Sequence, residues 1–231
     1  MNSQKDYWEK KIIKWEESAY QGKKSLTLPV IDRLAAPFRK ILKKRLKVAE
    51  KLVSKHITNK VVADLGCGTG IFLINLLKYK PKKIIGVDIA SSALEKANNN
   101  LRRLDIQGKA VFKYADLRKK TDILKEVDIV TGIGFIDYFD KKELRRLFKT
   151  IRGKIFLFSF PKKIISLREL LHRVYLLIAS CPGSFKYSEK EMDEIIRKAG
   201  FKKWHYYDVE NIRFVTNIKI WRKPSGKTKK Y

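Results

Sequence analysis

Three glycines at alternate positions, preceded by an acid, are the residues of this chain best placed to do chemistry. Asp64 stands two residues before Gly66, and Gly68 and Gly70 follow at every second position. Glycine can adopt positive φ, and it carries no Cβ that would keep a ligand away from the main chain. Apolar runs on either side of this loop predict a buried strand before it and the start of a helix after it. Such a unit forms the nucleotide crevice at the carboxyl edge of an open α/β sheet.

The spacing of the glycines distinguishes between classes of nucleotide site. A dinucleotide fingerprint needs a small residue at position 71, where this chain has Ile71, and the stretch lacks the Gly-Lys-Ser/Thr ending of a phosphate loop. The arrangement Asp-x-Gly-x-Gly-x-Gly resembles motif I of the class I S-adenosylmethionine-dependent methyltransferases. S-adenosylmethionine (SAM) has no phosphate but carries an ammonium and a sulfonium group, so an acid beside the loop suits its charge. The resemblance therefore implies SAM as the cofactor.

Three further segments continue the resemblance in register. Residues 83–88 read as a second strand that ends in Asp88, whose carboxylate can accept hydrogen bonds from both ribose hydroxyls. Residues 109–117 resemble the family's third strand, which runs into an adenine-binding acid, here Asp116, and residues 127–134 resemble its fourth. Either acid could instead be an ordinary strand-end or N-cap residue. The cofactor-binding residues that the resemblance implies are Asp64, Gly66, Cys67, Gly68, Gly70, Asp88, Ile89, Ala115, Asp116, Leu117, Gly132 and Ile133.

Strand and helix patterns alternate along the rest of the chain, as a doubly wound parallel sheet requires. We expect strands over 154–159, 201–209 and 212–220. The resemblance implies an α/β fold with a Rossmann-like seven-stranded sheet in the order 3-2-1-4-5-7-6, its last two strands forming an antiparallel pair.

Helix starts are marked by a Ser or Asp that precedes a Glu by three residues, the pattern of a capping box. The pattern occurs within 91–95, at Asp140 and at Ser188, and Gly200 has the position of a C-terminal helix stop. We therefore expect capped helices to begin at these three places.

Length and composition predict one α/β domain with additions. The 231 residues, 44% of them hydrophobic, can bury one sizeable core. The two cysteines lack metal-ligand spacing, no His/Asp/Glu cluster predicts a metal site, and the N-terminus has no apolar signal region. We expect a cytoplasmic protein with a methyltransferase domain over 57–221, a helical extension or lid over 1–56 and a basic tail over 222–231.

Two additions to the core are where this family usually holds its substrate. The first is the extension over 1–56, where apolar residues recur at helical spacing between 38 and 53. The second is a cap insertion over 161–187, after the fifth strand, with an apolar helix candidate over 164–178. Neither addition carries a motif that names the acceptor.

The formal charge of +29 predicts that the surface attracts polyanions. One segment carries eight basic residues against the single acid Glu50, and a basic amphipathic helix can lie on an anionic membrane surface. The alternative is an ordinary solvated face of a helix whose apolar side packs on the domain. The eight residues are Arg39, Lys40, Lys43, Lys44, Arg45, Lys47, Lys51 and Lys55.

The segment after the fourth strand bears on the acceptor. Base methyltransferases that act on exocyclic amines have two prolines there, whereas residues 131–139 have none. The run 135–139 instead resembles enzymes that methylate oxygen on small or lipid-linked molecules, and the closest resemblance is to the porphyrin and quinone O-methyltransferases. We expect a small or lipid-linked, anionic acceptor and peripheral contact with the inner face of a membrane. The alternatives are an RNA methyltransferase that uses the basic surface and a non-catalytic binding protein of the same fold.

A hydroxyl acceptor needs a general base, whereas a carboxylate acceptor does not. The candidate catalytic residues are His172, Asp137 and Tyr138. Tyr20 and Arg39 are candidates for binding the substrate, and Tyr20 is also a candidate base. A lone histidine on an apolar helix is more often structural, and Tyr138 could simply pack beside the cofactor.

Overall fold

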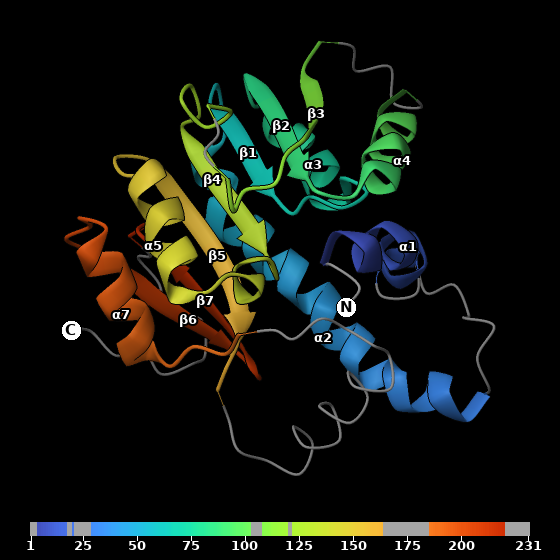
Figure 1. Ribbon diagram of the computed structural model, residues 1–231. Helices are drawn as coiled ribbons and strands as arrows, with labels where there is room; N and C mark the ends of the chain where they lie inside the picture. The colour runs from blue at the N-terminus through green and yellow to red at the C-terminus, as the bar shows by residue number, and fades with distance from the viewer. Residues whose placement is uncertain are drawn as a thin grey trace.

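Seven strands form one sheet, and helices cover both of its faces (Figure 1). The computed structural model describes residues 4–17, 20, 29–102, 108–119, 122–163 and 185–219, and of residues 15 and 29–39 it describes the backbone only. The strands are β1 (Val61–Leu65), β2 (Lys83–Asp88), β3 (Ala110–Tyr114), β4 (Ile129–Ile133), β5 (Ile155–Pro161), β6 (His205–Val209) and β7 (Ile212–Thr216). The helices are α1 (Gln4–Glu16), α2 (Pro29–Val53), α3 (Ile71–Leu76), α4 (Ser91–Arg102), α5 (Lys141–Thr150) and α7 (Glu189–Lys198), with short 3-10 turns η2 (Ser54–His56), η3 (Leu77–Tyr79) and η4 (Ile136–Tyr138).

The strand order β3-β2-β1-β4-β5-β7-β6 confirms the predicted order. β1 lies in the interior of the sheet between its parallel neighbours β2 and β4, and its last four residues are buried. A strand covered on both faces needs the continuous apolar run that this segment has. After β3 the chain returns to the other side of β1 to form β4, so the strand order reverses between β1 and β4, and sheets of this kind bind ligands at the carboxyl ends of such strands. β7 runs antiparallel between β5 and β6, as expected.

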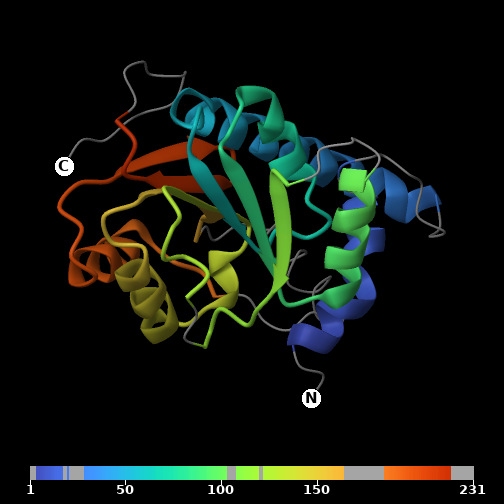
Figure 2. The same cartoon turned by 90° about the horizontal axis from the view of Figure 1, so that it is seen from above.

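Helices pack on the two faces in separate groups (Figure 2). α5 and α7 share one core cluster with the sheet, in which Phe148 meets Phe156 and Phe158 edge to face. α2, α3 and α4 contribute to a second cluster on the opposite face, where Ala49 and Val53 are fully buried. These two layers fix the sheet, and the strand ends therefore present their loops in a defined arrangement.

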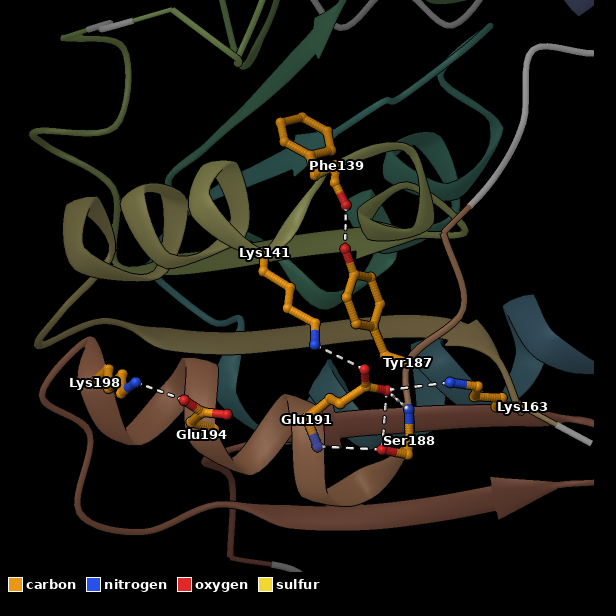
Figure 3. Close-up of polar contacts among 8 residues, drawn as sticks. All are labelled: Phe139, Lys141, Lys163, Tyr187, Ser188, Glu191, Glu194 and Lys198. Carbon is orange, nitrogen blue, oxygen red and sulfur yellow. Dashed lines mark hydrogen bonds and ion pairs between the residues drawn. The ribbon is translucent and has the colours of Figure 1, made fainter.

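Two of the three predicted capping boxes are confirmed. At α5, Asp140 accepts from the amide of Glu143, and the Glu143 carboxylate accepts from the amide of Asp140. At α7, Ser188 and Glu191 make the same reciprocal pair (Figure 3). Each box satisfies amides that the first helical turn leaves without a partner.

The capping box predicted within 91–95 is wrong. Ser91 is already the first residue of α4, and the amides of Ser91 and Ser92 donate to the carboxylate of Glu9 in α1, at 2.7 and 2.8 Å. The Ser92 hydroxyl also donates to the main-chain oxygen of Glu9. The cap therefore comes from a helix about eighty positions earlier in the chain, which a local pattern cannot reveal.

The two ends of the predicted cap insertion meet beside α7. Lys162 forms a parallel bridge with Tyr187, whose hydroxyl donates to the carbonyl of Phe139 (Figure 3). Lys163 lies at the same place, with its Nζ 3.7 Å from Oε2 of Glu191. The helix predicted over 164–178 and the basic tail over 222–231 lie outside the described residues.

Several predicted strands are shorter in the structure. The strand predicted over 212–220 ends at Thr216, where the Ile218 amide donates to the Thr216 hydroxyl. β3 ends at Tyr114, because Asp116 turns the chain by accepting from the Arg118 amide and, through its carbonyl, from Lys119. β6 begins at His205 and not at 201, because Phe201 packs into the core directly after α7. Residues 115–117 and 201–204 are therefore loops, and the strand assignment was wrong for them.

Candidate functional site

The glycine loop lies at the carboxyl end of β1 and is held there by β2. The amides of Gly66 and Cys67 both donate to the carbonyl of Val87, at 2.8 and 3.1 Å. Gly68 has φ 53°, and a Cβ at this position would overlap Oε1 of Glu16. Because both the backbone conformation and the space exclude a side chain, this position requires glycine. The predicted strand, turn and helix are confirmed.

Asp88 lies at the end of β2 and faces the glycine loop. Its Oδ2 accepts from the Gly68 amide at 2.8 Å, and its Oδ1 accepts from the Ala90 amide at 2.9 Å. Burial raises the pKa of this carboxyl, and the amide hydrogen bonds oppose the rise. Each oxygen keeps a lone pair for a further donor. The geometry suits the predicted contact with ribose hydroxyls.

Asp64 is buried between the last residues of β1 and β4. Its Oδ1 accepts from the hydroxyl of Thr131 at 2.6 Å, and the two residues stand in register on neighbouring strands. The pKa of Asp64 is raised to about 7. Burial is the largest cause and the charge of Asp88 adds to it, whereas the Thr131 hydrogen bond and the charge of Arg45 lower the pKa. A cation near this carboxyl would stabilise its ionised form.

Helix α1 crosses the carboxyl ends of the strands (Figure 1). Near its start, the ammonium of Lys5 lies 5.2 Å from the ring centre of Tyr114, at the end of β3. Trp8 meets the ring of Tyr138 after β4, with the ring centres 5.5 Å apart. The helix thus spans the edge of the sheet from β3 to β4, above the glycine loop.

Glu16 at the end of α1 reaches into that loop. Its Oε2 accepts from the Thr69 amide at 3.1 Å and from the Thr69 hydroxyl. The side chain is buried, and burial raises the pKa of Glu16 to about 7, with Asp88 and Asp64 adding to the rise. Three buried carboxylates therefore surround the glycine loop.

The sequence contained a signal for the acids of α1 that we did not use. Glu9 and Glu16 are seven positions apart, two helical turns, so both lie on the face of α1 that meets the sheet. Two tryptophans, Trp8 and Trp15, also lie in this helix. Trp8 does pack against the site, whereas the side chain of Trp15 lies outside the described residues.

The predicted adenine end already contains an ion pair. Both oxygens of Asp116 accept from the guanidinium of Arg118, at 2.9 and 3.0 Å. Burial would raise the pKa of Asp116, but the Arg118 hydrogen bonds outweigh burial and lower it. Leu117 is buried beside this pair, and the Ala115 amide donates to the carbonyl of Asp88. The adenine role of Asp116 and Leu117 stays a prediction.

Turn η4 places Asp137 directly after β4. The carboxyl of Asp137 is buried, and its Oδ1 has no hydrogen-bond partner within the described part of the chain. Burial raises the pKa of Asp137 to about 6, although its own amide and the charges of Arg45 and Lys186 lower it. The Phe185 amide donates to the Asp137 carbonyl at 2.6 Å. A carboxylate with a spare buried oxygen at this edge can accept a proton.

The end of β4 joins this carboxyl to the glycine loop. A Cβ at Gly66 would lie only 2.6 Å from the ring of Phe135, and the same ring limits the space at Gly132. Ile133 packs in the cluster on the α2 side of the sheet. The loops after β1 and β4 are therefore in direct contact, as a shared site requires.

Arg45 on α2 points into this site. Its Nη2 donates to the hydroxyl of Tyr20 at 2.8 Å, and a Cβ at Gly134 would overlap its Nη1. Ile41 and Ala49, four positions to either side, are also buried. The interpretation of the basic segment as an outer face is wrong for Arg45, since the spacing of four places it on the apolar stripe.

The lysines of α2 do form an exposed face. Lys44 pairs with Glu210 at 3.0 Å. In the described part of the chain, no helix is long and apolar enough to cross a bilayer. The exposed lysines of this segment are Lys40, Lys43, Lys44, Lys47, Lys51 and Lys55.

Two predicted site residues are not placed. His172 lies outside the described residues, and only the backbone of Arg39 is described, within α2. Tyr20 is placed beside Arg45, and Tyr138 beside Trp8. Asp137 stands two positions after Phe135, whose ring contacts Gly66 of the glycine loop.

Comparison by sequence finds similarity to a known family over part of the chain. The family described as "Methyltransferase domain" matches residues 62–154. The ribosomal protein L11 methyltransferase of Photobacterium profundum is 34% identical over 79 residues, which cover 34% of this chain and 26% of that protein. The same enzyme of Escherichia coli is 44% identical over 52 residues, 22% of this chain and 18% of that one. The matches thus span about a quarter or less of these relatives.

Comparison of structures extends the likeness over most of the chain. Magnesium protoporphyrin IX methyltransferase from Synechocystis, solved with bound S-adenosylhomocysteine, has a TM-score of 0.68 and 17% identity, covering 92% of this chain and 96% of that one. An S-adenosylmethionine-dependent methyltransferase from Mesorhizobium loti has a TM-score of 0.60 and 17% identity, covering 76% and 96%. At these identities the structures show a shared fold.

Proposed function

We propose that this chain, which carries a class I S-adenosylmethionine-dependent methyltransferase domain, transfers a methyl group to a hydroxyl oxygen of a small or lipid-linked, anionic acceptor. One observation carries the proposal: the carboxyl of Asp137 is buried, has an oxygen with no partner among the described residues, and stands two positions after Phe135, whose ring contacts Gly66 of the glycine loop. A carboxylate placed in this way can receive the proton that a hydroxyl loses on methylation.

The residues of the cofactor edge fit SAM. Asp64 and Asp88 are buried acceptors at the ends of β1 and β2, suited to an ammonium group and to ribose hydroxyls. Gly66 and Gly68 carry no Cβ, and the Phe135 ring and the Glu16 carboxylate lie against them. When bound, SAM supplies an activated methyl group on a cationic sulfur. The protein has to align the acceptor, exclude water and accept one proton.

The charge state of Asp137 sets the expected pH dependence. Its pKa is about 6, raised from its ordinary value by burial. The carboxyl is therefore ionised and able to accept a proton above about pH 6, and protonated and inactive below it. A carboxylate acceptor would need no base, so an essential Asp137 favours a hydroxyl acceptor.

The preference for an anionic acceptor follows from the cations near Asp137. Arg45 is buried with Nε unpartnered among the described residues, and Lys186 acts on the same carboxyl. Two cations beside one acid leave a net positive charge for an acidic group of the acceptor. The magnesium protoporphyrin IX methyltransferase, similar over 92% of this chain, supports a small-molecule acceptor by its name.

Labelled methyl transfer tests the acceptor class. The full chain is incubated with methyl-labelled SAM and cell extract, and the label is followed in the lipid, small-molecule, RNA and protein fractions. We expect label in the first two fractions that resists alkaline hydrolysis, because a methyl ether is stable and a methyl ester is not. Label that is lost after RNase treatment would support an RNA methyltransferase instead, and label in protein would support an activity like that of the L11 methyltransferases. Binding of SAM without any transfer would support the non-catalytic alternative.

Asp137→Asn tests the base. We expect the turnover rate to fall by about 100-fold or more, because the loss of a general base costs roughly that much. The acidic limb of the rate profile, with its midpoint near pH 6, should disappear. Asp122→Asn is the matched control, since Asp122 is an exposed acid paired with Lys125. An unchanged rate and pH profile in Asp137→Asn would exclude Asp137 as the base.

A further inference from the structure

The side chain of Glu16 contacts the cofactor loop, although Glu16 lies outside residues 62–154, the segment that matches the family. Its carboxylate sits against Gly68 and accepts from the amide and hydroxyl of Thr69. The neighbouring amide, that of Gly68, donates to Asp88. Adjacent amides of the glycine turn thus hold one carboxylate from β2 and one from the N-terminal helix.

Docking of α1 alone does not require a buried carboxylate at this position. Glu9 already fixes the helix to α4 through two amides, and Trp8 fixes it to Tyr138. The charges that act most strongly on Glu16 are those of Asp88 and Asp64, and both repel it. A buried carboxylate among like charges is costly unless a cation joins it.

We propose that Glu16 is a cofactor-site residue that, together with Asp64 and Asp88, makes the site prefer cationic SAM to its product S-adenosylhomocysteine. The inference rests on the proposed function, because it takes SAM as the ligand of this loop. SAM carries a positive sulfonium, and S-adenosylhomocysteine has a neutral sulfur in the same place. The carboxylates therefore attract the substrate form of the cofactor more strongly than the product form, and methyl transfer itself weakens the hold on the product.

The groups that face Glu16 come from four elements. Thr69 and Cys67 lie in the glycine loop, Asp64 in β1 and Asp88 in β2. Burial raises the pKa of Tyr20, and the charge of Glu16 adds to the rise. The Tyr20 hydroxyl accepts a hydrogen bond from Arg45 of α2. Arg45 is the cation of this set, and it acts on Asp64.

Proton release gives a readout that does not depend on turnover. The pKa of Glu16 is about 7, so the free protein holds this carboxyl partly protonated at neutral pH. A nearby cation lowers that pKa, and binding then releases a proton. We expect SAM to release about half a proton more than S-adenosylhomocysteine at pH 7, since a group at its pKa is half protonated. Calorimetric titration of each compound in two buffers of different ionisation enthalpy measures the difference.

Glu16→Gln tests the residue directly. We expect this variant to lose most of the extra proton release and to bind SAM about tenfold more weakly, with a change of about twofold or less for S-adenosylhomocysteine. Glu16→Asp keeps the charge and should retain the preference in part. Glu9→Gln is the matched control on the same helix, and it should affect both compounds equally, because Glu9 binds α4 and not the loop.

Two results would overturn the inference. One is equal proton release by SAM and S-adenosylhomocysteine in the unmodified protein, which needs no variant to fold. The other is a loss in Glu16→Gln that is the same for both compounds, as a merely structural role would give. The titrations contain no acceptor, so failure of methyl transfer to hydroxyl compounds leaves them interpretable. Absence of binding by both compounds would instead count against the cofactor assignment itself.

Discussion

The two halves of the site edge are built in different ways. In the cofactor half, around the glycine loop, the carboxylates of Asp88 and Glu16 accept from main-chain amides. In the half that we propose for the acceptor, called the acceptor half and lying around η4, the charged side chains of Asp137 and Arg45 each keep a buried atom without a hydrogen-bond partner in the described part of the chain. One half is satisfied internally, and the other has polar capacity left for a ligand.

This difference reflects what each half has to recognise. A cofactor used throughout a family can be bound by backbone geometry, which changes slowly with sequence. An acceptor that differs between relatives has to be read by side chains brought from separate elements, here α2, η4 and the segment from 185. The unpartnered atoms of the acceptor half are the places where a substrate gains most, because each is costly while it stays unsatisfied.

The largest expected effect is on the cofactor half, in Gly68→Ala. A Cβ there would overlap the carboxylate of Glu16, and the backbone is left-handed at φ 53°. We expect SAM affinity to fall by about tenfold or more, because the added methyl group displaces the Glu16 carboxylate from the loop and the left-handed backbone costs about 1–2 kcal/mol with a side chain. Calorimetric titration with SAM measures the loss.

Gly108→Ala is the control for that variant. Gly108 has φ 84° with no atom within 4 Å of an added Cβ. Gly108→Ala therefore loses about 1 kcal/mol of stability through the same backbone strain, and its added methyl group overlaps no other atom. Equal SAM affinity in the two variants would show that the glycine loop is only a tight turn.

A smaller effect is expected in the acceptor half, in Arg45→Met. Arg45 lowers the pKa of Asp137, so its loss should move the acidic midpoint of the rate profile from about 6 toward about 7. With saturating acceptor, the turnover rate should then fall about eightfold at pH 5.5 and stay unchanged at pH 8.5, where Asp137 is ionised in both proteins. The pH profile of labelled methyl transfer measures the shift.

Lys47→Met is the matched control for Arg45→Met. It removes one basic residue from the exposed face of the same helix, and its midpoint should stay near that of the unmodified protein. A profile of Arg45→Met that coincides with that of Lys47→Met would separate Arg45 from the acceptor half.

The cofactor half was predictable because its determinants are local in sequence. Alternate glycines after an apolar strand specify the turn of β1, and Asp88 follows from the end of the next strand. The capping boxes at Asp140 and Ser188 are local in the same sense, since the two partners of each box are three positions apart. The strand order followed from the resemblance and not from any pattern.

The parts that sequence did not reveal depend on contacts between distant elements. Glu9 caps α4 in place of the serine pattern that precedes that helix, and Glu16 reaches the loop after β1. Arg45 was grouped with the other seven basic residues of its segment, whose number hid its position on the apolar stripe. In each case the prediction used the charge of the residue and not the face of the helix on which it lies.

The smallest expected effect concerns the outer surface of the acceptor half and the proposed lipid-linked acceptor. The lysines of α2 face away from Arg45, and Lys43 is exposed among them. A lysine near an anionic bilayer contributes about 1 kcal/mol, so Lys43→Gln should weaken binding to phosphatidylglycerol vesicles by about fivefold. Lys113→Gln removes an exposed lysine from the edge strand β3, at the other end of the sheet, and should have no such effect. Sedimentation with these vesicles and with neutral phosphatidylcholine vesicles measures both variants. If the two variants bind anionic vesicles alike, the lysine face only solvates α2, and the acceptor reaches the site from solution.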